Sequence, residues 1–494
     1  MSLSNRALVI GSGFAGLSAA CFLAKGGAKV TVLEKHAIPG GRARRYSEAG
    51  FTFDMGPSWY WMPDAFERFF EKFGKTPADY YSLKRLDPSY SVFYDKSSID
   101  IPADYKKLQE LFESIEPGSS LKLDQFLEGA AYKYKVGMQK LVYKPGLSVW
   151  EFMDAEVFKG LFRLDLFSSM KTHIGSYFKD ERLKQLLEFP VLFLGALPSK
   201  TPALYSLMNY ADICLGTWYP DGGMYQIVDG MYRLAVSLGV EFRFNTEATH
   251  IAIRNNRAVA VQTDLESFAT DVVIGAADYH YIETELLSAK YQSYTEEYWD
   301  SRVLAPSSLI FYLGLNKKLS GLQHHSLFFD VSFDVHARAI YGDPSWPEDP
   351  LFYVSCTSTT DASVAPEGCE NLFVLIPLAT DLEGDSEARR AHYLDMVIAR
   401  METRLGQEIR SSIIYEKSFA GSEFKSEYHA FKGNAYGLAN TLAQTANLKP
   451  SIKSKKIKNL YYTGQLTLPG PGVPPALVSG ELVATQVFKE QFRK

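Results

Sequence analysis

Three glycines near the N-terminus stand at a spacing that suits phosphate binding. The segment Gly11-Ser12-Gly13-Phe14-Ala15-Gly16 matches GxGxxG, follows an apolar run that predicts a strand (6–11), and opens a predicted helix (14–26). Gly11 would permit a tight turn, Gly13 would let the backbone approach a pyrophosphate, and Gly16 would let helix and strand pack closely. The free N–H groups at the start of the helix would then stabilise the phosphates.

An acidic residue stands where a bound ribose would need an acceptor. Glu34 ends the next predicted strand (29–34), about twenty residues after the glycines, as in dinucleotide-binding units. Its carboxylate would accept hydrogen bonds from the ribose hydroxyls. Strand, glycine turn, helix, strand and acid together predict a dinucleotide-binding unit, which either NAD or FAD could occupy.

Two further segments extend this chemistry. Gly40-Gly41-Arg42 follows Glu34 closely, and Arg42 offers a planar fork of donors to a pyrophosphate or to ring carbonyls. Near the C-terminus, a predicted strand (459–464) runs into the turn 469–475 and a proline-led helix (476–488). A second helix N-terminus aimed at a ligand would stabilise negative charge there.

Composition narrows the function classes. Of the 494 residues 46% are hydrophobic and 22% are charged, which excludes a disordered or low-complexity chain, and the 14% of aromatic residues predicts a ring-lined apolar cavity. The net charge of −5 argues against a nucleic-acid partner. The four cysteines lie far apart in the sequence, so we predict neither disulfides nor a metal site. A reducing cytosol is the expected location. No stretch is apolar enough to predict a transmembrane helix, and we expect no cleaved leader.

The order of elements predicts an interleaved α/β protein. An aromatic helix (63–74) and a strand pair (90–102) precede a mostly helical stretch (108–208), and strands predominate from 300 to 420 around one long helix (386–404). We therefore expect a dinucleotide-binding domain built from residues 1–88, 215–290 and 425–494. A substrate domain would comprise 89–214 and 291–424, with a mostly helical, possibly membrane-facing part at 105–214.

The motifs in combination resemble one family. EKHAIPGGRA (34–43), GFTFDMGPSWYWMP (50–63), TWYPDGGMYQIVDGMYRLAVSLGVEFRFNTE (217–247) and NLYYTGQLTLPGPGVPPALVSGELVA (459–484) resemble, in this order, the bacterial-type carotenoid (phytoene) desaturases of the FAD-dependent amine oxidase-like superfamily. The resemblance implies a Rossmann-like FAD-binding domain of the glutathione-reductase type, interleaved with a mixed-sheet and helical substrate domain. The C-terminal turn departs from the usual family pattern at Gln465, Leu468 and Pro475.

The resemblance also implies positions for cofactor and substrate. The expected FAD contacts are Gly11, Gly13, Phe14, Ala15, Gly16, Glu34, Lys35, Gly41, Arg42, Ala43, Gly56, Pro57, Ser58, Ala248, Gly464, Gln465, Val473 and Pro474. The expected substrate contacts are aromatic: Trp59, Trp61, Trp218, Tyr219 and Tyr225. For any one of these rings taken alone, plain core packing is the favoured interpretation.

The implied reaction takes a hydride and a proton from a long isoprenoid polyene to form a C=C bond, with quinone or oxygen as the final electron acceptor. The substrate would be phytoene, or a hydroxylated or partly unsaturated carotenoid as in a 1-hydroxycarotenoid 3,4-desaturase. No general base is identifiable: Asp54 and Asp221 suit turn or cap roles, and His173, His250 and His280 are isolated.

Two other classes stay open on sequence alone. One is a different flavin oxidase of the superfamily, acting on amines or protoporphyrinogen, and the other is a non-catalytic isoprenoid-binding protein of the GDP-dissociation-inhibitor type. Because a carotenoid dissolves only in membranes, we expect peripheral attachment to the inner face of the membrane. A lysine run at 449–458 and the helices near 150–170 are the candidate contacts.

Overall fold

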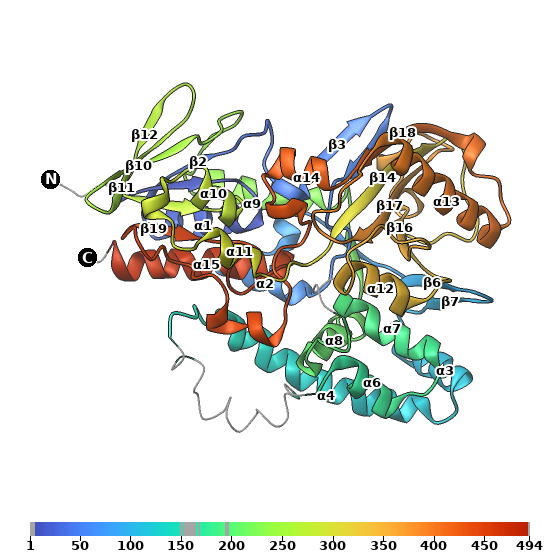
Figure 1. Ribbon diagram of the computed structural model, residues 1–494. Coiled ribbons are helices and arrows are strands. Elements are labelled where there is room, and N and C mark those ends of the chain that lie inside the picture. The colour runs from blue at the N-terminus through green and yellow to red at the C-terminus, as the bar shows by residue number, and fades with distance from the viewer. Residues whose placement is uncertain (1–4, 149–150, 152–164, 166–167, 193–196, 493–494) are drawn as a thin grey trace.

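The computed structural model describes residues 5–148, 151, 165, 168–192 and 197–492, and it confirms the predicted α/β class (Figure 1). A parallel sheet lies beside both termini, a larger mixed sheet lies at the other side, and a layer of helices runs below them. The predicted helical segment 156–167 lies almost wholly outside the described residues.

The parallel sheet is assembled from three separated stretches of chain. Its order is β19-β13-β1-β2-β9, and every neighbouring pair is parallel. The strands are β1 (Arg6–Ile10), β2 (Lys29–Leu33), β9 (Glu241–Arg243), β13 (Val272–Gly275) and β19 (Leu460–Tyr462). The runs ALVI and VVIG are buried throughout, as expected of strands covered on both faces.

Three helices cover one face of this sheet. Helix α1 (Phe14–Lys25) packs against α15 (Val473–Glu490) and α9 (Tyr225–Ser237). The contact with α15 is backbone to backbone, because a Cβ on Gly480 would lie 2.5 Å from the Ala19 nitrogen. Helix α15 begins at Val473, so the predicted start at 476 was three residues late: the two prolines lie inside its first turn.

The larger sheet has seven strands in the order β18-β14-β17-β16-β15-β6-β7. They are β6 (Tyr90–Tyr94), β7 (Ser98–Ile101), β14 (Ser307–Leu315), β15 (His325–Phe329), β16 (Phe352–Ser355), β17 (Glu370–Leu378) and β18 (Ile413–Phe419). Only the β6–β15 pair is parallel. The sequence analysis found all of these strands except β15, whose five residues are buried and show no alternation.

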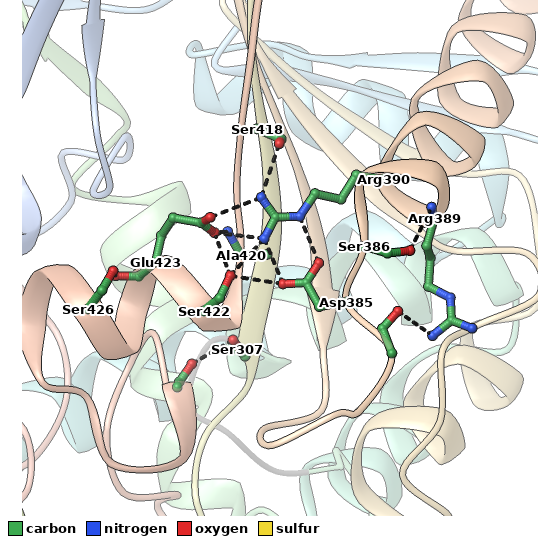
Figure 2. A network of polar contacts seen from close by, with 12 residues as sticks. Ser307, Asp385, Ser386, Arg389, Arg390, Ser418, Ala420, Ser422, Glu423 and Ser426 are labelled. Carbon is green, nitrogen blue, oxygen red and sulfur yellow. Dashed lines mark hydrogen bonds and ion pairs between the residues drawn. The ribbon is translucent and has the colours of Figure 1, made fainter.

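One face of the larger sheet is closed by helix α13 (Glu387–Leu405). A polar network anchors this helix, as Figure 2 shows: the Arg390 guanidinium lies between Asp385 and Glu423, at 2.7 Å from Asp385 Oδ1 and 2.8 Å from Glu423 Oε2. Glu423 belongs to α14 (Gly421–Tyr428), which follows β18. The network therefore fixes α14 relative to α13.

The other face of the larger sheet packs on a helical layer. Its helices are α3 (Tyr105–Ile115), α4 (Ser119–Gln139), α6 (Met170–Tyr177), α7 (Glu181–Leu192) and α8 (Leu207–Ile213). Helix α12 (Phe333–Tyr341), which the sequence analysis did not predict, lies between this layer and the sheet (Figure 1). In the described part of the chain, no helix combines the length and hydropathy needed to cross a membrane.

Smaller elements join these layers. They are α2 (Pro63–Glu71), α10 (Tyr279–Thr284), α11 (Glu296–Asp300), the ribbon β3 (Arg45–Glu48) and β4 (Phe51–Asp54), the pair β5 (Leu83–Arg85) and β8 (Trp218–Pro220), and the sheet β10 (His250–Arg254), β11 (Arg257–Gln262) and β12 (Ser267–Ala269). The turn between β10 and β11 has Asn255 and Asn256 both in the left-handed conformation, as two-residue hairpins favour.

Candidate active site

The glycine turn after β1 leaves room for a ligand at one position only. A Cβ on Gly11 or Gly16 would meet backbone atoms, the second at 2.1 Å from the Gly11 oxygen, whereas a Cβ on Gly13 would have nothing within 4 Å. No side chain caps the N-terminus of α1 at Gly13. The N–H groups of Phe14 and Ala15, in the first turn of α1, lie beside this open space and suit a pyrophosphate.

Glu34 lies beside the glycine turn. We call the candidate FAD site that these residues form the cradle. Its Oε2 accepts hydrogen bonds from the Ser12 backbone at 2.9 Å and from the Ser12 hydroxyl at 2.5 Å, and its Oε1 accepts one from the His36 backbone at 2.9 Å. Because a carboxylate oxygen has more than one lone pair, Glu34 retains acceptor capacity for ribose hydroxyls. Ala248 is buried beside the same strand ends.

Arg42 lies in the turn Gly41–Ala43, directly over the glycine loop. Gly41 approaches Gly13 so closely that its Cβ would lie 3.3 Å from the Gly13 Cα, and a Cβ on Gly56 would lie 2.4 Å from the Arg42 oxygen. Three segments far apart in the sequence thus meet at Arg42. Gly56 and Pro57, two of the predicted FAD contacts, lie next to Arg42.

The Arg42 guanidinium is buried, and part of its donor fork is unused. With its amide oxygen facing Arg42, Gln465 accepts hydrogen bonds from Nη1 at 3.2 Å and Nη2 at 2.9 Å. Nη2 also donates to the Asn434 carbonyl at 3.3 Å, while Nε has no partner among the described residues. Burial lowers the pKa of Arg42, and the nearby carboxylate of Asp278 opposes this shift. A buried cation with a free donor fits a bound anion or ring carbonyl.

The C-terminal segment completes the cradle. A Cβ on Gly464 would lie 3.9 Å from the Ala15 Cβ. The Gly464 N–H donates to Ser479 Oγ at 3.0 Å. Helix α15 starts with Val473 and Pro474 after Gly472, again without a capping side chain. Two uncapped helix N-termini therefore belong to one site.

Two predicted FAD contacts have their side chains elsewhere: Ser58 lines the smaller cavity described below, and Lys35 binds α14. The Lys35 Nζ donates to the Ser426 carbonyl at 3.0 Å and lies 3.2 Å from His429 Nε2, both near the end of α14. Arg44 binds the same helix through Glu427 Oε2 at 2.7 Å. Lys35 and Arg44 thus hold α14 against the cradle.

An apolar cavity lies between α12 and the inner face of the larger sheet. Leu327, Phe329, Tyr353 and Leu375 line it from the sheet, and Phe333 lines it from α12. Its wall also includes Tyr436, two residues after Asn434, which contacts Arg42.

None of the five predicted substrate contacts lines this cavity, and three of them lie in packed or hydrogen-bonded positions away from it. Trp218 donates from Nε1 to the Leu215 carbonyl at 2.8 Å, and the Tyr219 hydroxyl donates to Asp361 Oδ2 at 3.1 Å. Tyr225 packs in the core near α1, with the Arg45 guanidinium 4.8 Å above its ring. Tyr219 does line a second, smaller cavity, described below.

Trp59 and Trp61 lie behind the wall of the apolar cavity. Both contact Phe189, a lining residue, with ring centroids 5.9 Å and 6.1 Å away. Trp61 donates from Nε1 to Thr217 Oγ1 at 2.8 Å, and Thr217 donates to the buried Asp212. The tryptophans position the aromatic wall from behind.

Comparison with known proteins decides the family. The model of the flavin-containing amine oxidoreductases matches residues 14–488. The chain is 41% identical over 484 residues, 98% of both chains, to a carotenoid 3,4-desaturase of Haloarcula japonica. It is 31% identical over 490 residues, 98% of this chain and 94% of the relative, to a zeta-carotene-forming phytoene desaturase of Myxococcus xanthus. The chain belongs to the carotenoid desaturases of this flavin-dependent family.

The fold of this desaturase is shared more widely. An oxidoreductase from Methanosarcina mazei aligns over 97% of this chain and 100% of its own, with a TM-score of 0.63 at 18% identity. At that identity the likeness concerns the fold alone. The family assignment sets aside the amine-oxidase and inhibitor readings, and it makes FAD the cofactor.

The cradle fits that cofactor. The open position at Gly13, the two uncapped helix N-termini and the unpartnered Arg42 Nε provide space and donors for FAD phosphates and ring oxygens. The glycine, acid and arginine positions predicted from sequence thus meet in one place.

A smaller polar cavity of the desaturase was not foreseen from sequence. Its lining residues are Phe53, Asp54, Ser58, Tyr219, Met224, Ser355, Thr357, Asn371 and Phe373. Asp54 accepts hydrogen bonds from the backbone N–H of Met224 at 2.7 Å and of Tyr225 at 3.0 Å, the cap role considered from sequence. Burial raises the pKa of Asp54 to about 6. Asp221 likewise has structural partners, Ser82 and Lys84.

Two buried histidines stand beside this polar cavity. His324 Nδ1 lies 2.8 Å from Thr360 Oγ1, and His325 Nδ1 lies 2.6 Å from the Tyr353 hydroxyl. Burial lowers the pKa of both rings, so they are neutral at physiological pH. The sequence analysis singled out other histidines instead. Of those, His173 contacts Lys133 and His280 contacts Glu296 away from the cavities.

Proposed function

We propose that this desaturase introduces a C=C bond at the 3,4 position of a carotenoid, near one end of the polyene. The apolar cavity carries the proposal, because its lining of aromatic and aliphatic side chains suits an apolar polyene. The full-length identity with a carotenoid 3,4-desaturase supports the choice of bond over the earlier steps from phytoene.

The bond that is formed determines the chemistry that the site must carry out. The reaction breaks two C–H bonds on neighbouring carbons: one hydrogen leaves as a hydride and the other as a proton, and the C=C bond forms between the carbons. FAD supplies the hydride acceptor, and a quinone or oxygen would then take up the two electrons. The residues of the chain hold the polyene in one orientation and exclude water from it.

The proposed FAD contacts are those of the cradle. Gly13, Phe14 and Ala15 would bind the pyrophosphate, Glu34 the ribose, and Arg42 with Gln465 the ring end. Gly11 and Gly16 shape the loop, and Gly41, Ala43, Gly56, Pro57, Gly464, Val473 and Pro474 surround it. We infer that Lys35 acts only through α14. The FAD domain would comprise 1–88, 215–290 and 425–494, and the substrate domain 89–214 and 291–424.

The test is an anaerobic assay of the purified holoenzyme with two carotenoids. One has a saturated 3,4 bond next to a long polyene, and the other is phytoene. A bathochromic shift of the first carotenoid, with bleaching of the flavin band, is the expected result. Conversion of phytoene alone would contradict 3,4-desaturation and would indicate a phytoene desaturase instead.

We also propose peripheral binding to the inner face of the cytoplasmic membrane. Two exposed leucines support it: Leu147 is 41% and Leu448 52% exposed, and their loops touch, since a Cβ on Gly146 would lie 3.6 Å from the Asn447 Cα. The lysine run expected to serve this purpose is only partly at the surface: Lys455, Lys456 and Lys458 are exposed, whereas Lys449 and Ile452 are buried and Lys453 pairs with Glu490. The candidate helices near 150–170 lie largely outside the described residues.

Liposome pelleting at low salt tests this surface. The protein should sediment with vesicles containing anionic lipid, and a double Leu147→Ser, Leu448→Ser variant should stay in the supernatant. Leu265→Ser, which changes an exposed leucine in a remote loop, is the matched control. Equal sedimentation of all three proteins would contradict membrane contact at these loops.

A further inference from the structure

Helix α14 links the larger sheet to the cradle, and it is held at both ends. At its start, Glu423 belongs to the network around Arg390 that Figure 2 shows. At its end, Glu427 Oε2 accepts a hydrogen bond from Arg44 Nη2 at 2.7 Å. Because Tyr428 is the last residue of α14, these contacts also determine where its ring lies.

The ring of Tyr428 lies beside two guanidinium groups. The Cζ atoms of Arg42 and Arg44 are each 5.3 Å from the centroid of this ring. At such a distance a cation is attracted to the face of an aromatic ring, and the attraction is stronger where water is excluded. Arg44 is neutralised by Glu427, whereas in the described part of the chain Arg42 forms no ion pair. Arg42 therefore depends on the ring more than Arg44 does.

The contacts of Arg42 leave one donor directed at a ligand. Gln465 accepts from Nη1 and Nη2, the Asn434 carbonyl accepts from Nη2, and the Tyr428 ring lies against Cζ. These contacts fix the plane of the guanidinium. Arg42 Nε is inaccessible to solvent and has no partner among the described residues. A buried unpaired donor costs free energy, which a bound acceptor would recover.

We propose that Tyr428 is a positioning residue for FAD, because its ring holds the Arg42 guanidinium in place for the cofactor. The inference rests on the proposed contact between Arg42 and the ring end of FAD. A positive charge near the flavin stabilises reduced flavin, which is the more negative form, over oxidised flavin. The position of Arg42 therefore affects both FAD affinity and the reduction potential. The Tyr428 hydroxyl has no part in this, since it lies 3.5 Å from Arg44 Nη2, at the limit of a hydrogen bond.

The test measures the Kd of FAD and the flavin reduction potential, the latter by equilibration with a reference dye. Tyr428→Leu should raise the Kd about threefold for oxidised FAD and about tenfold for reduced FAD. The threefold difference between the two forms lowers a two-electron potential by about 14 mV. Tyr428→Phe keeps the ring and should match wild type in both measurements. Tyr428→Met, a second variant without the ring, should reproduce the shift if Tyr428→Leu folds poorly.

A double variant shows whether Tyr428 acts through Arg42. Arg42→Met combined with Tyr428→Leu should bind FAD as Arg42→Met alone does, because no guanidinium is left for the ring to hold. Additive losses, or an unaltered potential in both ring-free variants, would overturn the inference. An unaltered Kd and potential in Arg42→Met would instead overturn the proposed FAD contact of Arg42. These measurements use no carotenoid, so they do not depend on the proposed 3,4-desaturation.

A matched control separates positioning from the stability of α14. Phe424 lies one turn earlier on the same helix, and its buried ring packs on Phe419 with centroids 5.0 Å apart. Phe424→Leu should lower the melting temperature and leave the flavin potential as in wild type. A shift of the potential in Phe424→Leu as large as in Tyr428→Leu would mean that any loosening of α14 has this effect, and it would refute a specific role of Tyr428.

Discussion

The carboxylate of Asp54 caps helix α9 from another strand: Oδ2 accepts from the Met224 N–H at 2.7 Å, and Oδ1 from the Tyr225 N–H at 3.0 Å. Through this contact the ribbon β3–β4, which leads to Gly56, is fixed to a helix that packs on α1. The FAD cradle and the polar cavity thus share one anchoring side chain.

Loss of this cap should destabilise the protein without removing a reacting group. We expect Asp54→Ala to lower the free energy of unfolding by about 1 to 2 kcal/mol, the usual value for a helix cap. Urea unfolding followed by circular dichroism measures this. The control is Asp104→Ala, which removes the cap of α3 far from the cradle. Flavin retention should fall for Asp54→Ala alone.

Asp54 also predicts a pH dependence of stability. Its pKa is raised from 3.8 to about 6 in the folded protein, chiefly by burial, so the folded state binds this proton more tightly than the unfolded state. The contribution of Asp54 to stability is therefore present below pH 4 and is lost as the pH rises to 6. Asp54→Asn should abolish this slope in urea titrations at successive pH values, and an identical slope in the variant would refute the assignment.

Two glycines of the cradle should respond oppositely to the same change. Gly13→Ala adds a methyl group in open space at an allowed φ of −67°, so the protein should fold normally and lose FAD affinity about tenfold. Gly16→Ala would place a Cβ 2.1 Å from the Gly11 oxygen and should lower stability by about 3 kcal/mol. Thermal melting and the flavin content of the purified proteins separate the two effects.

Glu34→Gln should weaken FAD binding through the ribose and the loop together. The amide keeps one oxygen acceptor, but its NH₂ group faces donors at Ser12 or His36, so we expect about a tenfold rise in Kd. Flavin fluorescence on dilution reports the release. Glu241→Gln, at an exposed position on neighbouring β9, provides the reference and should bind FAD as wild type does.

Lys449 should make the protein more stable as the pH rises. Burial lowers its pKa to about 7, and Nζ donates to Asn440 Oδ1 and to the Pro469 carbonyl, both at 2.8 Å. Because its folded pKa lies below the ordinary value of 10.5, its contribution grows between pH 7 and 10.5 and is lost as the pH falls through 7. Melting temperatures of Lys449→Met over this range should lose that rise, whereas those of Lys453→Met should keep it.

Local patterns made the cradle predictable. The glycines, Glu34 and Arg42 lie within 32 residues of one another, and strand and helix periodicity places each of them at a strand end or helix start. The aromatic substrate contacts were harder to predict, because Trp59 and Tyr225 are both aromatic but pack in different parts of the core. Ring content alone does not distinguish a cavity wall from packed interior.

The positions of the two buried histidines depended on strand pairing that sequence patterns do not reveal. His325 meets Trp59 and Tyr353 because β15 lies between β6 and β16, and β6 precedes it by more than two hundred residues. The run HSLFF is too short and too uniformly buried to show a strand period. The only signal in the sequence was the adjacent pair His324 and His325. This pair could be interpreted only once the residues that contact it in the fold were known.

The position of β19 and α15 has a consequence for synthesis of the protein. β1 and α1 are synthesised first, but α15, the C-terminal helix that packs on α1, begins only at residue 473, and β19, the outer neighbour of β13, begins only at residue 460. The face of α1 that later receives Gly480 is therefore uncovered on the nascent chain until α15 has been synthesised. A chain truncated before α15 would leave this apolar face of α1 uncovered.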